Sequence, residues 1–220
     1  MMIERGDVTY VHEPWLALTE TGEVRLPGPD GGEAVLESDE ELRDHLLLLA
    51  RERPVFVKEV LDYRYPYLYE HPEEVASFTH AFIVREPRPT IASHYAVKPT
   101  VTSPEIGFER QWDLFDALWS ASGRKPLVIR TERLTSDPEP VVRSFCDYVG
   151  LPFMAESLEW KPQDRPEWQR HRKWHLGAID STGFSQPRTE YEATVDNNEL
   201  LRSFYDYHLP FYERITSHAE

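Results

Sequence analysis

The stretch AFIVREPRPTIASHY, residues 81–95, decides the fold that this sequence predicts. Its first four residues are apolar, with β-branched and aromatic side chains, which is typical of a strand buried on both faces in a parallel sheet. Pro87 and Pro89 end this strand, and Pro89 suits the first turn of a helix that continues to residue 95. Ligands of open α/β sheets bind beyond the carboxyl ends of strands, so Arg85 is predicted to lie where a ligand would bind.

Ser93 follows Arg85 by eight residues and falls on the second turn of the predicted helix. A guanidinium fork and a nearby hydroxyl together suit the oxygens of one phosphate group. The alternative is that Arg85 is a surface arginine and Ser93 an ordinary helix serine. The strand-turn-helix setting favours the phosphate hypothesis enough that both interpretations stay open.

Length and composition indicate one globular domain over residues 1–220. A chain of this length buries about 70% of its unfolded surface, and 40% hydrophobic residues fit a packed core. The net charge is −15, from 39 acidic and 24 basic residues. This balance argues against a nucleic-acid or anionic-membrane partner, whose binding surface needs excess Lys and Arg. A local basic pocket for one anion remains compatible with it.

Cys146 is the single cysteine, which excludes an internal disulfide and a thiolate metal cluster. We therefore expect a reducing, cytoplasmic location. No apolar run approaches the ~18 residues that a membrane span requires. The sequence MMIERGDV at the N-terminus has neither the basic start nor the apolar stretch of a signal peptide.

Predicted strands and helices alternate along the chain, which indicates an α/β fold: a parallel sheet with helices on both faces. A loose loop or an exposed hairpin is expected around residues 27–32. The predicted strands are residues 8–11, 55–57, 81–84 and 127–129, and the main predicted helices are residues 39–53, 105–121, 137–149 and 196–207.

Residues 160–187 differ from the rest in combining low hydropathy with three tryptophans, several prolines and basic side chains. Such a composition suits a segment that covers a cleft, and we call these residues the covering segment. His171 and His175 within it are four apart and could meet a metal ion on one helix face. Because the sequence shows no third ligand, no metal site is predicted.

Polar groups follow the predicted strands: His12 and Glu13, then Lys58, Arg85 and Arg130. One carboxylate with several cations at one rim suits transfer of an anionic group from a nucleotide. The carboxylate can take a proton from an attacking hydroxyl, and a lysine can offset charge on the leaving oxygen. The alternative is that these are polar residues that simply finish strands.

Several segments resemble sulfotransferases that use 3′-phosphoadenosine 5′-phosphosulfate (PAPS). VIRTERLTSDPEPVVRSFCDYVGLPF, residues 128–153, resembles the segment after the last strand of that family. The family's 3′-phosphate motif is similar to FIVREPRPTIASHY, and its strand with a lysine near the transferred group is similar to VFVKEV. An "EP" turn common in bacterial members is similar to VTYVHEPW. A late segment that closes over the nucleotide is similar to WHLGAIDSTGF. The likeness covers residues 6–212 and implies a P-loop sulfotransferase-like fold.

The resemblance also implies roles for individual residues. Arg85 and Ser93 would hold the 3′-phosphate, and Lys58 would lie near the transferred group. Glu13 would be the base, with His12 as its substitute. The residues that would close over the nucleotide are Trp174, His175, Ser181, Thr182 and Gly183.

One departure from the family concerns its opening strand and its loop of the type P-R-S-G-S-T, which cradles the 5′-phosphosulfate. This chain has no such segment and starts at MMIERG, where the family's first helix would end. We therefore expect a fold that lacks its first strand, exposing strand edges through which copies of the chain could form a homo-oligomer.

The sequence thus predicts metal-free sulfuryl transfer from PAPS to a hydroxyl of a small-molecule or sugar-like acceptor. A rival from another class is a catalytically impaired remnant that binds a partner or nucleotide without chemistry. A second enzymatic rival is a kinase of similar architecture, which would need Mg²⁺.

Overall fold

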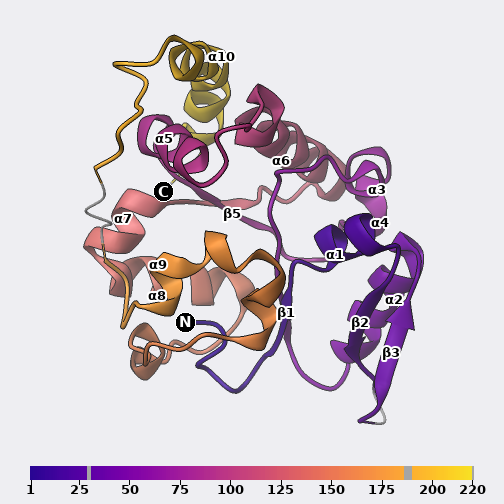
Figure 1. The fold of residues 1–220 in the computed structure, drawn as a ribbon. Coiled ribbons are helices and arrows are strands. Elements are labelled where there is room, and N and C mark those ends of the chain that lie inside the picture. The colour runs from indigo at the N-terminus through magenta and orange to yellow at the C-terminus, as the bar shows by residue number, and fades with distance from the viewer. Residues whose placement is uncertain (29–30, 186–189, 220) are drawn as a thin grey trace.

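The computed structural model describes residues 1–28, 31–185 and 190–219, and its strands form three two-stranded sheets (Figure 1). β1 (Thr9–His12) runs parallel to β4 (Val55–Lys58), and β5 (Ala81–Val84) runs parallel to β6 (Leu127–Arg130). β2 (Val24–Pro27) and β3 (Glu33–Leu36) form an antiparallel hairpin. The mixed α/β fold with parallel strands is confirmed, and so is the hairpin, although residues 29 and 30 lie outside the described part.

The four parallel strands lie in two separate pairs rather than in one continuous sheet. Within the described residues no backbone pairing joins β4 to β5. The absence of a first strand stays a prediction. The same holds for association of copies through exposed strand edges.

Burial on both faces of β5 was a wrong prediction. Phe82 and Val84 are buried, whereas Ala81 is exposed and the Ile83 side of the strand is open, with Ile83 55% exposed. Ile129, the register partner of Ile83 on β6, is buried on this same face because it packs with α8. The helix therefore covers β6 and leaves β5 uncovered there.

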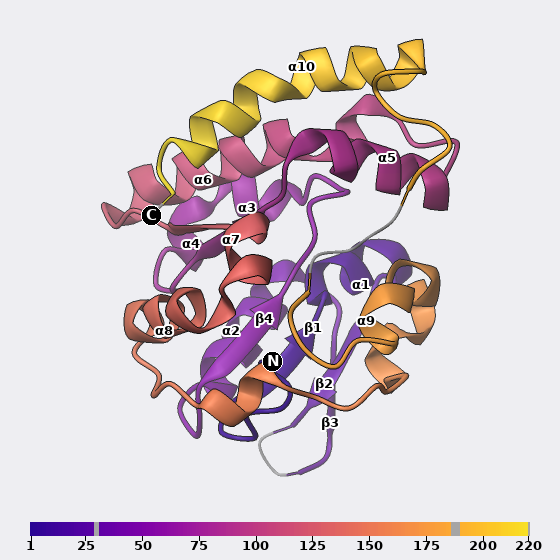
Figure 2. The same cartoon turned by 90° about the vertical axis from the view of Figure 1, so that its left-hand side faces the viewer.

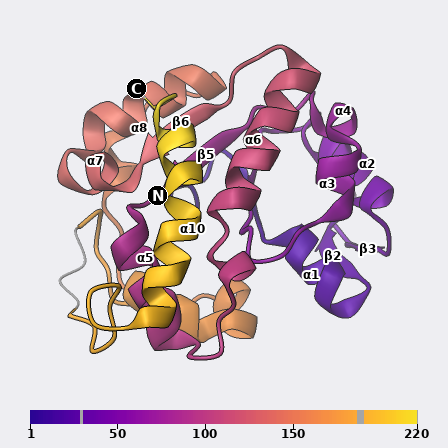
Figure 3. The ribbon, with the colours of Figure 1, turned by 90° about the horizontal axis from the view of Figure 1, so that it is seen from above.

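Helices pack on both faces of the β5–β6 pair, on one of them over β6 alone. α6 (Phe108–Ser122) and α10 (Glu199–Thr216) share one core with Phe82, Val84 and Val128. α8 (Pro138–Val149) packs with Leu127 and Ile129 on the opposite face. Figure 2 shows α10 lying along α6 and α5 at one end of the molecule, with α8 nearer the other, and Figure 3 shows α10 and α6 side by side from above.

Shorter helices fill the connections between these layers. They are α1 (Pro14–Thr21), α2 (Asp39–Leu49), α3 (Pro66–Glu70), α4 (Pro72–Val75), α5 (Pro87–Val97), α7 (Thr131–Ser136) and α9 (Leu176–Ile179), with 3₁₀ turns η1 (Ser103–Ile106), η2 (Ala155–Leu158) and η3 (Pro166–Trp174). Among the described helices, none has the length and apolar character to cross a bilayer.

The last helix begins later than predicted, and one helix was not predicted at all. The last helix was predicted from residue 196 with Asp196 as its cap, but it begins at Glu199, capped by the side chain of Asn198, which accepts a hydrogen bond from the Leu201 N–H. The Asp196 carboxylate instead accepts a hydrogen bond from Arg88 at 2.7 Å. Helix α1 was not predicted, although Pro14 at its first position is a common start signal.

Phe115 lies at the centre of the larger core, and its truncation tests that packing. The side chain is 0% exposed and meets the rings of Phe82, Trp112 and Trp119. We expect Phe115→Ala to lower the free energy of unfolding by about 3–5 kcal/mol, because it leaves a cavity. Leu200→Ala, at an exposed position of α10, is the control and should change it by less than about 0.5 kcal/mol. Urea unfolding of both variants measures this; equal effects would contradict the described core.

Candidate active site

The carboxyl ends of β1 and β4 bring Glu13 and Lys58 together. His12 and Lys58 are register partners, and the Glu13 N–H donates to the Lys58 carbonyl at 2.7 Å. The backbone then turns sharply, because Glu13 has φ 45° and ψ 53° and Pro14 starts α1 directly after it. Glu13 is the one described non-glycine residue with positive φ. That conformation costs on the order of 1–2 kcal/mol, so the neighbouring structure must hold it in place.

A partly buried ion pair joins the two side chains. The Lys58 ammonium contacts Glu13 Oε1, and the two side chains are 34% and 7% exposed. Burial by itself would raise the pKa of the Glu13 carboxyl, but the charge and hydrogen bond of Lys58 outweigh it, so the pKa lies below its usual value. Glu13 is therefore a carboxylate at neutral pH.

His12 lies against Glu13 with one ring nitrogen unpartnered. Its Nδ1 is 2.8 Å from the Tyr10 hydroxyl, and its Nε2 is 3.6 Å from Glu13 Oε2 without a hydrogen-bond partner. Burial lowers the pKa of His12 to about 4, so the imidazole is neutral near pH 7. Tyr10 was not predicted as a neighbour of His12, although residues i and i+2 of a strand share a face.

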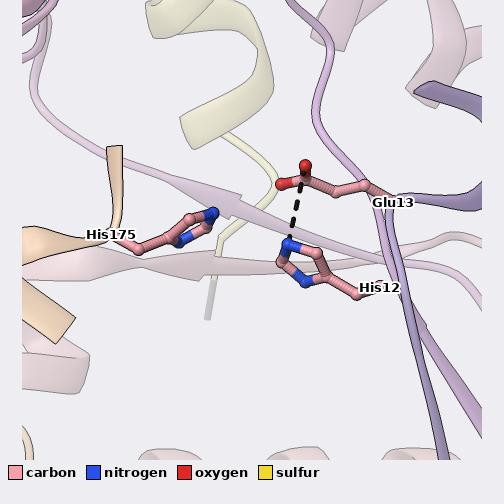
Figure 4. Close-up of side chains that lie close together, drawn as sticks. All are labelled: His12, Glu13 and His175. Carbon is pink, nitrogen blue, oxygen red and sulfur yellow. Dashed lines mark ion pairs between the residues drawn. The ribbon is translucent and has the colours of Figure 1, made fainter. Parts of the chain in front are cut away.

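Trp174 and His175 of the covering segment lie close to the carboxyl ends of the parallel strands. The His175 ring lies 5.2 Å from that of His12, centroid to centroid, and Figure 4 shows both rings and Glu13 pointing toward a common point. The Trp174 ring packs edge-on against His94 of α5, with 5.0 Å between centroids. Two consecutive residues thus contact both parallel pairs, one at the end of β1 and one on the helix that follows β5.

Arg85 and Ser93 lie on the β5 side of this arrangement. Arg85 directly follows β5, and Ser93 is on α5 immediately before His94. Burial lowers the pKa of His94, although the nearby charges of Asp62 and Glu105 oppose that shift. The joint grip of Arg85 and Ser93 on a phosphate stays a prediction.

Ser181, Thr182 and Gly183 pair with Trp160 of the covering segment and with Glu159 directly before it. The Trp160 indole donates to Ser181 Oγ at 2.8 Å, and the Trp160 N–H donates to the Thr182 carbonyl at 3.0 Å. Gly183 forms an isolated bridge with Glu159, and a Cβ on it would lie 3.2 Å from the Leu158 carbonyl oxygen. These contacts fix the fold of the segment, and a role toward a nucleotide stays a prediction. Residues 186 and 187, the last two assigned to the segment, lie outside the described part.

A cavity of about 230 Å³ opens beside Glu13, between α1 and the covering segment. Its lining combines apolar and charged side chains from both: His12, Glu13, Leu16, Ala17, Pro166, Glu167, Arg170 and His171. A small polar molecule bound there would lie next to Glu13. A segment that covers a cleft was predicted from the sequence, but Leu16, Glu167 and Arg170 were not predicted to line that cleft.

His171 and His175 do not share a helix face. His171 has φ −120° and ψ 34°, which breaks the helical run between them, and its Nε2 lies 3.0 Å from Glu20 Oε2. The ligand-type atoms that do converge in the described residues belong to His12, Glu13 and His175, all within 4.8 Å of one another. The spacing of four in the sequence therefore suggested the wrong histidine pair.

Glu59 follows Lys58 and supports the start of α1. Its carboxyl oxygens accept hydrogen bonds from the Trp15 N–H and the Val60 N–H, each at 2.9 Å. Burial raises its pKa to about 7. Glu59 therefore links the end of β4 to the helix that carries Glu13 as its N-cap.

Comparison with known proteins gives one family and two plant relatives. A family model described as a sulfotransferase domain matches residues 2–219. Branched-chain-amino-acid aminotransferase-like protein 2 of Arabidopsis thaliana is 29% identical over 225 residues, covering 99% of this chain and 38% of that protein. Branched-chain-amino-acid aminotransferase-like protein 1 of the same plant is 31% identical over 146 residues, covering 64% of this chain and 25% of that protein. The chain thus spans well under half the length of either relative.

The raised pKa of Glu59 predicts a pH dependence of stability. Between the ordinary pKa of 4.5 and about 7, the folded protein holds a proton that the unfolded chain releases, so rising pH favours unfolding. Glu59→Gln removes this titration. We expect the stability of the variant relative to the wild type to rise across that window, by at most about 1.4 kcal/mol per pH unit, and to level off above it. Urea unfolding at several pH values measures this, and parallel curves would contradict the assignment.

Proposed function

The chain belongs to the sulfotransferase domain family, and we propose that it transfers the sulfuryl group of PAPS to a hydroxyl of a small-molecule or sugar-like acceptor. The observation that carries this proposal is the ion pair of the buried Glu13 with the partly exposed Lys58 at the ends of two parallel strands. It places a carboxylate and a cation together beside a cavity. Those are the two charges that in-line transfer of an anionic group needs.

Glu13 is the proposed general base. Its carboxylate lines the cavity beside α1, where an acceptor hydroxyl can reach it. It removes the hydroxyl proton while the oxygen attacks sulfur and the bond from sulfur to the donor phosphate oxygen breaks. His12, neutral and 3.6 Å away, is the proposed substitute.

Lys58 is proposed to steady the bridging oxygen of the donor as that bond breaks. An ammonium has three N–H donors, so it can hold Glu13 and still donate to the donor. A shift of Lys58 toward the donor would weaken its hold on Glu13. Burial would then raise the pKa of Glu13 and make it a stronger base when the donor is bound.

Arg85 and Ser93 are proposed to hold the 3′-phosphate, with Trp174 and His175 closing over the nucleotide. Support comes from the packing of Trp174 on His94, the neighbour of Ser93. Ser181, Thr182 and Gly183 are proposed to contribute from the same segment. The reaction is proposed to need no metal and to take place in the cytoplasm, without a nucleic-acid or membrane partner.

Two simple measurements separate the rivals. Transfer that continues in EDTA favours a sulfotransferase over a kinase, which needs Mg²⁺ to neutralise phosphate charge. Calorimetry with 3′,5′-adenosine diphosphate tests for a remnant, which would give little or no heat of binding.

Glu13→Gln tests the base. A general base contributes about 10²–10⁴-fold, so turnover should fall by that factor. Affinity for 3′,5′-adenosine diphosphate should stay nearly the same because the amide keeps the shape of the side chain. Glu52→Gln, at an exposed position, is the matched control and should turn over like the wild type. Unchanged turnover in Glu13→Gln would remove Glu13 from the mechanism.

Arg85→Ala tests the phosphate contact. Loss of a charged hydrogen bond should weaken binding of 3′,5′-adenosine diphosphate by ~1.5–3 kcal/mol, measured by calorimetry. Arg51→Ala removes an exposed arginine elsewhere and controls for net charge. Equal affinities in the two variants would argue against a phosphate site at Arg85.

A further inference from the structure

Three ligand-type side chains converge where the covering segment meets the end of β1. Ligand atoms of His12, Glu13 and His175 all lie within 4.8 Å of one another (Figure 4). His12 and Glu13 are adjacent in the sequence, whereas His175 comes from the far end of the chain. The covering segment therefore completes the cluster.

Two of the three have a ring nitrogen without a hydrogen-bond partner. His12 Nε2 and His175 Nε2 are both buried and without a hydrogen-bond partner. The His12 side chain is only 8% exposed. Buried polar atoms in proteins are usually hydrogen-bonded, so two unpartnered ring nitrogens beside one carboxylate could share one bound partner.

The surroundings orient these groups as ligand environments do. Tyr10 engages His12 Nδ1 at 2.8 Å, which leaves Nε2 directed at Glu13. The ring of Trp168 stacks on His175 with 5.3 Å between centroids and 15° between planes. Lys58 occupies Glu13 Oε1, so Oε2 is the oxygen that faces His12. Such outer contacts commonly fix metal-binding imidazoles.

The distances suit a small tetrahedral ion after a modest closure. Zn²⁺ bonds of about 2.0–2.1 Å at tetrahedral angles put ligand atoms roughly 3.3–3.4 Å apart. His12 Nε2 and Glu13 Oε2 are already 3.6 Å apart. The longest separation allowed in the cluster, 4.8 Å, requires a movement of about 1.4 Å by a side chain such as His175.

We propose that His12, Glu13 and His175 form a three-ligand site for a divalent transition-metal ion, Zn²⁺ being the best match, and that the ion competes with use of Glu13 as the base. Two imidazoles and a carboxylate are a common zinc donor set, and the fourth position stays open to water. The metal site stands on the cluster alone. The competition rests on the proposed function, because a bound cation would take the lone pair with which Glu13 accepts a proton.

Calorimetry with ZnCl₂ tests the site without any donor or acceptor. We expect one Zn²⁺ per wild-type chain and at least about tenfold weaker binding in His175→Ala, which loses a direct ligand. His171→Ala is the matched control, since His171 lies four residues earlier and pairs with Glu20 instead. It should bind Zn²⁺ as the wild type does. His175→Gln and Glu13→Gln, which keep side-chain volume, repeat the comparison, with thermal unfolding in ZnCl₂ as a second readout.

Each outcome decides one part of the proposal. Absence of stoichiometric Zn²⁺ binding overturns the site. The site is also overturned if Zn²⁺ binding is unchanged in His175→Ala, His175→Gln and Glu13→Gln, or if it is lost in His171→Ala. For the competition, ZnCl₂ should inhibit sulfuryl transfer by the wild type and EDTA should restore it. Zinc that binds and leaves the transfer rate unchanged overturns the competition while keeping the site, and loss of the proposed transferase activity would leave the calorimetric result untouched.

Discussion

The ion pair between the buried Glu13 and the partly exposed Lys58 is the interaction on which the site depends. It fastens the end of β1 to the end of β4 through side chains, beside the backbone hydrogen bond from Glu13 to the Lys58 carbonyl. A carboxylate that is 7% exposed would be costly without a cation beside it. The same contact fixes the ionisation state of Glu13, so the stability of this corner and its chemistry have one origin.

Next to that pair the backbone adopts a strained turn. Glu13 takes a left-handed conformation that residues other than glycine seldom adopt, and Pro14 begins a helix at the next position. Glu59 holds the first turn of that helix through the Trp15 N–H. Strain held in this way by surrounding contacts is typical of functional positions.

The covering segment joins parts that the sheets leave separate. Strands β1 and β4 form one parallel pair, β5 and β6 another, and no backbone pairing connects β4 with β5 in the described residues. Trp174 packs on His94 of α5, the helix that follows β5, and His175 lies against His12 at the end of β1. Two neighbouring residues of the covering segment thus contact elements that belong to both halves of the strand arrangement.

The sequence by itself determined the type and order of most elements, because apolar runs, prolines and glycines act locally. It also marked Glu13 and Lys58, since strand ends can be read from where such runs stop. Which side chains are buried, and which residues they contact, was decided by the tertiary structure alone. It left Ile83 exposed, moved the start of α10 to Glu199, and chose His12 over His171 as the neighbour of His175. Those outcomes depend on contacts between residues far apart in the chain, for which local spacing carries no signal.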